Sequence, residues 1–413
     1  MLICLMIIFW RRILENYPRT ATLIIMILKR LIYKIIIILF IVIFIFLPAK
    51  FYLCEKTDDI TGKENQNSSR MSGILFEKKI KYLLRSFPPP FKNTTKYLLM
   101  QIPQHWNGDC GGLANQMWRY AVIYSLAKST GRFPGISYAS TWTCDKLNSP
   151  REIQRTFPLY HAVQYYFQVE SNDDFIYDRT FEDHCCKYYD AGILEKYTAK
   201  YLIISPPPQS PKYLLNINKE IRELFRFSDD IRMNVDNFIY RLFRSDKSHK
   251  FCVYTRRGDF TKAKWKEWHK ASDFMFTKKG AEYILKNELK HKKFGTSIVL
   301  LGEDKQFLYK LNITNKGKKI YIPEPMNRGH DMCFAITICN SLLLTASSST
   351  YGWWIGYLLK KENVKVFYDA DFSHSLVSIE NFPNNWIPII YDTKLNKIKK
   401  FKKNIKYKLS NTQ

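Results

Sequence analysis

The chain has 413 residues, which is enough for two domains of ordinary size. Lysine and arginine total 64 against 37 aspartates and glutamates, so the formal net charge is +27 at pH 7. That excess favours anionic surfaces or ligands, but the basic residues are spread along the chain without a recognisable nucleic-acid-binding module, so nucleic acid is not a predicted partner.

The amino-terminal part carries the most apolar segment of the chain. Residues 35–47 contain no charged or polar side chain, and their apolar neighbours extend the predicted transmembrane anchor to residues 31–53. A bilayer span needs roughly 20 such residues. Arginines and lysines gather before the span, so the positive-inside rule keeps residues 1–30 cytosolic and places the rest in a lumen. No convincing small-residue cleavage site follows, which favours an uncleaved anchor over a signal peptide.

Residues 54–96 are polar, charged and interrupted by Pro88-Pro89-Pro90, and are predicted to form a stem. Asn67, Asn93 and Asn312 each begin a glycosylation acceptor pattern. Eight cysteines follow the span, an even number that allows disulfides in an oxidising compartment, although the sequence does not choose the pairing. His184-Cys185-Cys186 lacks a second ligand pair at zinc-site spacing, so a disulfide partner or buried thiol is favoured over a metal ligand.

From residue 97 onward, short apolar runs alternate with segments of helical periodicity, which predicts an α/β body with parallel sheets. Residues 201–211 are predicted to form a loop and residues 246–250 a hinge. The first lobe is therefore placed at 97–248, the second at 249–393, and a solvated, mobile basic tail at 394–413. The predicted strands are residues 97–102, 251–255, 297–301, 318–322, 341–345 and 364–367.

The first polar motif is the glycine pair Gly111-Gly112, which follows a predicted strand and opens a helix that runs to about Lys128. A glycine turn at a helix start lets backbone N–H groups approach an anion, and Asn115 could add an amide contact. A plain tight turn explains the same pattern equally well.

The second motif is Arg256-Arg257-Gly258-Asp259, at the end of an apolar run. The planar guanidinium suits two phosphate oxygens at once, and ligands of open α/β sheets lie at the carboxyl ends of the strands. An arginine–aspartate ion pair at a turn is the structural alternative.

The third motif combines a predicted buried strand with four consecutive hydroxyl residues, 347–350, at the start of a second helix. Capping a helix needs one hydroxyl, so the surplus favours a ligand such as phosphate.

The runs GGLANQMWRYAVIYSLAKSTGR, VYTRRGDF and DMCFAITICNSLLLTASSSTYGWWIGYL, in this order, resemble the α-1,2-fucosyltransferase family, the galactoside 2-α-L-fucosyltransferase-like enzymes of glycosyltransferase family 11. The resemblance implies a GT-B-like fold of two Rossmann-type lobes facing a cleft, GDP-fucose as donor, inversion at the anomeric carbon and no required metal. It further implies a type II protein of the Golgi membrane that forms an α-1,2 linkage to a terminal galactose on a glycoprotein or glycolipid.

The same resemblance implies roles for individual residues. Arg256 would grip the diphosphate, Asp259 would brace the arginine loop, and Asn115 would reach across from the first lobe. Two residues depart from the family pattern, since Tyr254 stands where histidine is usual and Ala114 replaces a usual glycine. The second change should narrow the allowed backbone angles of the turn. The predicted donor-binding set is Gly112, Asn115, Arg256, Arg257, Asp304, Ser349 and Thr350.

Fucosyl transfer builds negative charge on the departing GDP, so Arg256 is the predicted stabilising cation. Inversion also asks for a group that accepts a hydrogen bond from the acceptor hydroxyl. Four residues on or just after the arginine loop are candidates, with Asp259 and His269 ahead of Glu267 and Asp273.

Two alternatives remain open at this stage. A metal-dependent GT-A transferase could use Asp369 and Asp371, which have the Asp-x-Asp form, although an ordinary turn explains them better. A catalytically inactive, membrane-tethered binder of a GDP-sugar or glycan is the other, because Tyr254 departs from the family pattern.

Overall fold

The computed structural model describes residues 62–101, 112–138, 151–180, 186–204, 209–314, 319–361, 364–373 and 375–401. The predicted anchor at 31–53 and the His184-Cys185 pair lie outside these ranges. Within them, no helix is both long and apolar enough to cross a membrane. The chain divides into two units, residues 1–77 and 78–413.

A long helix, α3 (Gly62–Leu84), occupies much of the segment predicted to be a stem. This helix was not predicted from the sequence, and the role of the segment as a stem stays a prediction. The apolar residues Phe76, Ile80 and Leu83 recur at helical spacing, and Leu83 is fully buried. Asn67 lies in this helix. Asn93 is exposed in a turn and Asn312 is exposed just after α10, and glycosylation at all three stays a prediction.

The first lobe is built on a five-stranded parallel sheet with the strand order β3-β2-β1-β5-β4. Tyr97 in the central strand lies opposite Phe133 on one side and Tyr201 on the other. Residues 201–204 were expected to be a loop, but they form β5, because the buried Tyr-Leu-Ile-Ile run precedes the prolines. The strands are β1 (Tyr97–Met100), β2 (Phe133–Ser137), β3 (Tyr166–Phe167), β4 (Phe175–Asp178) and β5 (Tyr201–Ile204).

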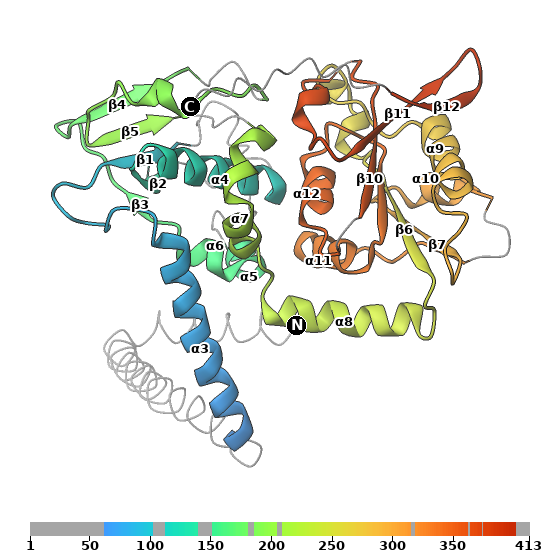
Figure 1. The fold of residues 1–413 in the computed structure, drawn as a ribbon, viewed down its shortest axis with the longest axis horizontal. Coiled ribbons are helices and arrows are strands. Elements are labelled where there is room, and N and C mark those ends of the chain that lie inside the picture. Colours follow the sequence, from blue (N-terminus) through green and yellow to red (C-terminus); the bar gives the residue numbers. More distant parts are fainter. Residues whose placement is uncertain are drawn as a thin grey trace, which may run out of the picture. The chain divides into compact units, whose positions relative to one another are not determined.

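Most helices of the first lobe lie beside this sheet, whereas the last one, α8, extends along the second lobe and packs Phe238 and Phe243 against Phe334 (Figure 1). The most buried is α4, whose residues are almost all enclosed because it packs on the sheet and also on the second lobe. The helices are α4 (Leu113–Ser129), α5 (Arg151–Thr156), α6 (Pro158–Ala162), α7 (Asn218–Leu224) and α8 (Asp229–Phe243).

The second lobe is built on a seven-stranded sheet with the order β12-β11-β10-β9-β6-β7-β8. All pairings are parallel except that of β12 with β11. Because β12 belongs to the sheet, residues 397–400 are not the mobile end that was expected from residue 394, although their lysines are exposed to solvent. The strands are β6 (His249–Tyr254), β7 (Thr296–Leu301), β8 (Ile320–Tyr321), β9 (Ser341–Leu344), β10 (Lys365–Asp369), β11 (Ile387–Asp392) and β12 (Lys397–Lys400).

Two helix layers cover the second sheet (Figure 1). One face packs Phe251 and Val253 of β6 into a core with α9 (Phe274–Asn287) and α10 (Lys305–Lys310). The other face turns Cys252 and Tyr254 toward α11 (Arg328–Ile338) and α12 (Thr350–Leu358). Successive strand residues point to opposite faces of the sheet, so each side chain near the end of β6 faces one of these two helix layers.

The two lobes meet where α4 packs against α12. The ring centroids of Trp118 and Trp353 lie 4.3 Å apart, and the Trp354 indole N–H donates to the carbonyl of Ala114 at 3.1 Å. Ala114 lies inside helix α4, where alanine is the most favourable residue, so the expected restriction of the turn does not arise. The α/β class and the two sheets predicted from the sequence are confirmed.

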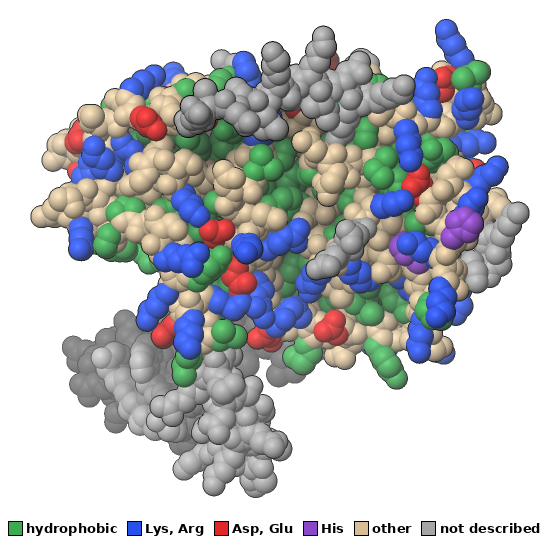
Figure 2. Space-filling view, viewed as in Figure 1, with side chains coloured by type: hydrophobic (Ala, Val, Ile, Leu, Met, Phe, Trp, Pro, Cys, Tyr) green, Lys and Arg blue, Asp and Glu red, His purple; other side chains and the backbone are tan. Residues whose placement is uncertain are grey.

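On the face of the molecule seen in Figure 2, basic side chains occur on both lobes. Figure 2 shows lysine and arginine side chains scattered over the visible face, with acidic side chains between them.

Candidate functional site

Arg256 stands just beyond the end of β6, on a loop that closes back on its own start. Its backbone N–H donates to the Ser272 hydroxyl at 2.8 Å, and the Ser272 N–H donates to the Arg256 carbonyl at 2.9 Å. Its Nη2 donates to Oδ2 of Asp259 at 2.9 Å. The predicted brace between Arg256 and Asp259 is therefore present, and it orients the guanidinium.

Arg257 has different partners, although it was also predicted to bind the donor. Its Nε donates to Asp304 Oδ2 at 3.0 Å, and its Nη1 donates to the Ser272 carbonyl at 2.9 Å. The guanidinium carbon lies 4.4 Å from the ring centroid of Phe307 in α10. Asp304 in turn caps α10 by accepting from the Phe307 N–H. Arg257 and Asp304 thus bind each other and hold the loop on the sheet.

A cavity of about 250 Å³ opens at the carboxyl ends of β6 and β7. It lies wholly within the second lobe, and residues from α11, α12 and the loop after β8 complete it. Its polar lining combines cationic, anionic and phenolic groups. These lining residues include Tyr254, Arg256, Glu303, Lys305, Arg328, Asp331 and Tyr351.

Asp331 is a site residue that sequence reasoning missed. It lies in the first turn of α11, where its Oδ1 accepts from the Met326 N–H at 3.1 Å. Burial raises the pKa of this carboxyl to about 6. An aspartate at the start of an otherwise apolar helix was the available signal, but a helix-start aspartate more often only stabilises the helix dipole.

Tyr254 joins the arginine motif to the hydroxyl motif. Its side chain is 5 % exposed, and its hydroxyl lies 3.1 Å from the Ser349 hydroxyl. Burial raises the pKa of the phenol to about 12. A Cβ on Gly352 would lie 2.7 Å from the Tyr254 ring, so only glycine allows this approach. The residue that departs from the family pattern is thus a packed link between the two motifs.

The hydroxyl turn, residues 347–350, forms hydrogen bonds that stabilise the fold. Ser349 caps α12 by accepting from the Gly352 N–H at 3.3 Å, and Ser347 donates to the Asp369 carbonyl at 2.5 Å. Ser349 and Thr350 do not line the cavity beside Arg256. They line a separate small space of about 20 Å³ together with Trp118 of the first lobe.

The glycine motif of the first lobe lies near the same region. A Cβ on Gly112 would lie 3.3 Å from Nη1 of Arg328, which lines the cavity. Asn115 follows in the first turn of α4, and its buried Oδ1 has no hydrogen-bond partner among the described residues. Gly112 therefore lies beside one residue of the cavity lining, and the Asn115 side-chain oxygen is an unused acceptor in the first turn of α4. Anion binding by this turn stays a prediction.

His269 is stacked on Phe260, with ring centroids 4.4 Å apart. Burial lowers its pKa, so the imidazole is neutral at neutral pH. It does not line the cavity beside Arg256. Asp273 caps α9 by accepting from the Phe276 N–H at 2.7 Å, and Glu267 is exposed.

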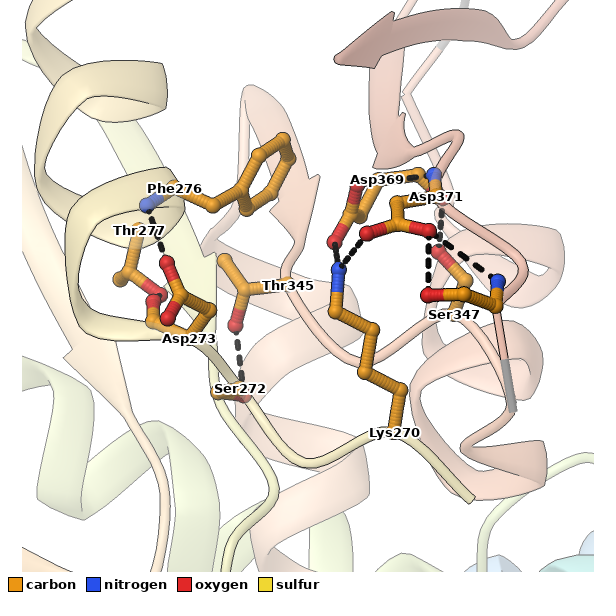
Figure 3. Close-up of polar contacts among 10 residues, drawn as sticks. Lys270, Ser272, Asp273, Phe276, Thr277, Thr345, Ser347, Asp369 and Asp371 are labelled. Carbon is orange, nitrogen blue, oxygen red and sulfur yellow. Dashed lines mark hydrogen bonds and ion pairs between the residues drawn. The ribbon is translucent and has the colours of Figure 1, made fainter. Parts of the chain in front are cut away.

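The Asp-x-Asp pair is occupied by a lysine. The ammonium of Lys270 lies 3.1 Å from Asp369 Oδ2 and 2.6 Å from Asp371 Oδ2 (Figure 3). Within the described ranges, no group of three histidine, cysteine, aspartate or glutamate side chains is placed to hold a metal ion. Cys186, which was weighed as a metal ligand, is disulfide-bonded.

The sequence matches the model of Glycosyl transferase family 11 over residues 96–390. Two similar proteins come from Caenorhabditis elegans. One, a galactoside 2-alpha-L-fucosyltransferase, is 26 % identical and covers 73 % of this chain and 77 % of its own. The other, a putative galactoside 2-alpha-L-fucosyltransferase named svh-11, is 27 % identical over 76 % of this chain and 85 % of its own.

Solved structures with a similar arrangement include NodZ alpha-1,6-fucosyltransferase co-crystallised with GDP, at 13 % identity and a TM-score of 0.40, covering 75 % of this chain and 99 % of that one. POFUT1 in complex with GDP-fucose matches at 10 % identity and a TM-score of 0.40, covering 68 % and 99 %. The family match spans both lobes and all three motifs, and this chain belongs to glycosyl transferase family 11.

Proposed function

We propose that this protein is an inverting fucosyltransferase that moves L-fucose from GDP-fucose to a terminal galactose of a glycan in α-1,2 linkage. Family membership supports glycosyl transfer, and the names of the two nematode relatives support the donor sugar and the linkage. The observation that carries the proposal is a single cavity lined by Arg256 and Asp331 together.

The two groups suit the two ends of GDP. Guanine presents N1–H and N2–H donors side by side, and a carboxylate accepts both, so Asp331 is the proposed partner of the base. Arg256 lies at the strand end, where its guanidinium can reach diphosphate oxygens. Because the nucleotide cavity lies within the second lobe, the acceptor is proposed to approach from the side of Gly112 and Asn115.

Bond breaking between the anomeric carbon and the β-phosphate oxygen leaves negative charge on GDP. A guanidinium already oriented by Asp259 and Ser272 stabilises that charge more in the transition state than in the ground state. Asp259 accordingly acts as a positioning residue, since its carboxylate is bound to Arg256. His269, which is stacked on Phe260, supports the same loop.

Neither alternative considered from the sequence is favoured. The carboxylates of Asp369 and Asp371 that a GT-A enzyme would offer to a metal are both bound to Lys270. An inactive binder would need no oriented cation, whereas Arg256 is fixed at its backbone and its side chain.

We further propose that residues 31–53 anchor the chain in the Golgi membrane, with the catalytic body in the lumen. The support is the apolar sequence and the basic residues before it. Protection of the body from added protease in sealed Golgi vesicles would agree with this orientation, and digestion would contradict it.

The activity is tested with full-length protein in detergent, GDP-fucose and a galactose-terminated acceptor, by following GDP release and fucosylated product. Arg256→Ala should lower kcat by roughly 10² to 10³ fold, as expected for loss of one oriented group facing developing charge. Lys310→Ala, at an exposed lysine in α10, is the control and should retain activity. Full turnover by the Arg256 variant would remove this residue from the mechanism.

A further inference from the structure

Lys270 links the arginine loop to the turn after β10 in the second lobe. It lies on the loop that begins with Arg256, two residues before Ser272. Its side chain reaches the turn after β10, where it contacts Asp369 and Asp371 at 3.1 Å and 2.6 Å. Figure 3 shows the ammonium pointing between the two carboxylates.

Every carboxylate oxygen of this pair has a partner. Asp369 Oδ1 accepts from the Asp371 N–H at 3.0 Å, and Asp371 Oδ1 accepts from the N–H and hydroxyl of Ser373 at 3.0 and 2.6 Å. The two remaining oxygens, both Oδ2, accept from Lys270. The lysine therefore takes the only two oxygens that backbone and serine leave available among these described residues.

The Asp369 carboxylate is buried, so it needs a positively charged partner. The Asp369 side chain is 2 % exposed and that of Lys270 is 26 % exposed. A buried carboxylate without a partner is costly, so a cation is needed at this position if Asp369 is to remain charged. Burial accordingly raises the pKa of Asp369 to about 6, and Lys270 counteracts that shift.

The cluster is connected to the proposed donor site in two ways. Ser272 holds the Arg256 backbone and also accepts from the Thr345 hydroxyl at 2.7 Å, so the loop is fastened at its end to β9. Ser347 of the hydroxyl turn donates to the Asp369 carbonyl at 2.5 Å. The turn after β10, the hydroxyl turn and the arginine loop are thus held together at one strand edge, and Lys270 supplies the only charged link among these contacts.

We propose that Lys270 is a positioning residue for fucosyl transfer. Its ammonium group fixes the Arg256 loop on the Asp369–Asp371 turn. It does so by lying between two carboxylates, a place that would otherwise suit a divalent cation. The inference rests on the proposed function, because it assigns the lysine to the same site. Two consequences follow, one for turnover and one for cation binding.

For turnover, Lys270→Ala should lower kcat by about 10 to 100 fold while the KM for GDP-fucose changes less, because displacement of a transition-state contact by ~1 Å costs about that much. The matched control is Lys365→Ala. Lys365 lies at the opposite end of β10 and forms an ion pair with Glu288 at 2.8 Å, so its loss should leave kcat unchanged. An unaltered kcat in the Lys270 variant would overturn the proposal.

For cation binding, Lys270→Ala should leave two neighbouring carboxylates that bind Mn²⁺, a cation that prefers oxygen ligands. Electron paramagnetic resonance should show loss of the free Mn²⁺ signal with this variant, and added MnCl₂ should restore part of its kcat. The double variant Lys270→Ala/Asp371→Asn should do neither. Failure of Lys270→Ala to bind Mn²⁺ would also overturn the proposal.

The two readouts separate this inference from the proposed function. If the unaltered protein does not transfer fucose, the proposed function fails while Mn²⁺ binding by the variant still tests the geometry. If the Lys270→Ala protein does not fold, Asp371→Asn is tested in its place. This variant removes one of the two carboxylates that bind Lys270. That variant should lower kcat as well, and wild-type kcat would contradict the role of Lys270.

Discussion

Arg256 and Arg257 are adjacent and chemically identical, yet they contact different parts of the lobe. Side chains alternate between the two faces along β6, so Arg256 follows Cys252 and Tyr254 toward α11, α12 and the cavity. Arg257 follows Val253 toward α10, where it meets Asp304 and Phe307. The motif predicted both arginines as donor ligands, because residue type alone does not identify the face of the sheet. The alternation of buried residues in β6 could have separated them.

Asp331 offers the most direct test of nucleotide recognition at the residue scale. Asp331→Asn replaces two acceptor oxygens by one acceptor and one donor, so the contact to two guanine donors is lost. The KM for GDP-fucose should rise about 10 to 100 fold, as expected for hydrogen bonds to a charged group. Folding should be unaffected, because the Asn carbonyl can still accept the Met326 N–H.

The same residue predicts a pH dependence. The pKa of Asp331 in the free protein is about 6, and only the carboxylate accepts both guanine donors. The KM for GDP-fucose should therefore be constant above pH 7 and rise as the pH falls through 6. Steady-state kinetics of Asp331→Asn should lack this rise, and an identical pH profile in both proteins would exclude Asp331 from base recognition.

The elements that the sequence predicted well are buried, apolar strands followed by a polar motif. Residues 251–255, 297–301 and 341–345 were predicted within one or two residues of β6, β7 and β9. Six strands were not predicted, namely β2, β3, β4, β5, β11 and β12. For β5 and β12 the reason can be identified. The prolines after β5 suggested a loop, and the lysines of β12 suggested a solvated tail, although lysine is common on an edge strand. An edge strand depends on its neighbour β11, which the local sequence does not reveal.

The link between β6 and the end of α11 is predicted to dominate the stability of the second lobe. The disulfide Cys252–Cys339 closes a segment of 87 residues, and chain entropy gives such a cross-link about 4 to 5 kcal/mol. The double variant Cys252→Ala/Cys339→Ala should lower the melting temperature by about 10 °C or more. Cys333→Ala is the control, because Cys333 is a buried free thiol in the same helix. Equal melting temperatures for the two variants would show that the cross-link adds no stability.

At the scale of the whole molecule, the first and third motifs meet because the helices they open pack together. The sequence order of the motifs was sufficient for the family resemblance, but it did not predict that the first turn of α4 would accept a hydrogen bond from α12. Nor did it predict that Ser349 and Thr350 would lie outside the cavity of Arg256. Both facts depend on the tertiary packing of α12 between Tyr254 and Trp118, which local sequence patterns do not encode.

Trp354 is predicted to make the two lobes unfold as one. Its side chain is fully buried, its indole donates to Ala114, and its ring centroid lies 5.0 Å from that of Phe225 and 5.1 Å from that of Trp118. Trp354→Ala should cost about 3 to 5 kcal/mol, because it opens a cavity between the lobes. Since that loss falls on the contact between the two sheets, calorimetry should resolve two transitions in place of one. Trp268→Ala, at an exposed tryptophan on the arginine loop, should keep a single transition. A single, merely shifted transition in the Trp354 variant would mean that other contacts couple the lobes.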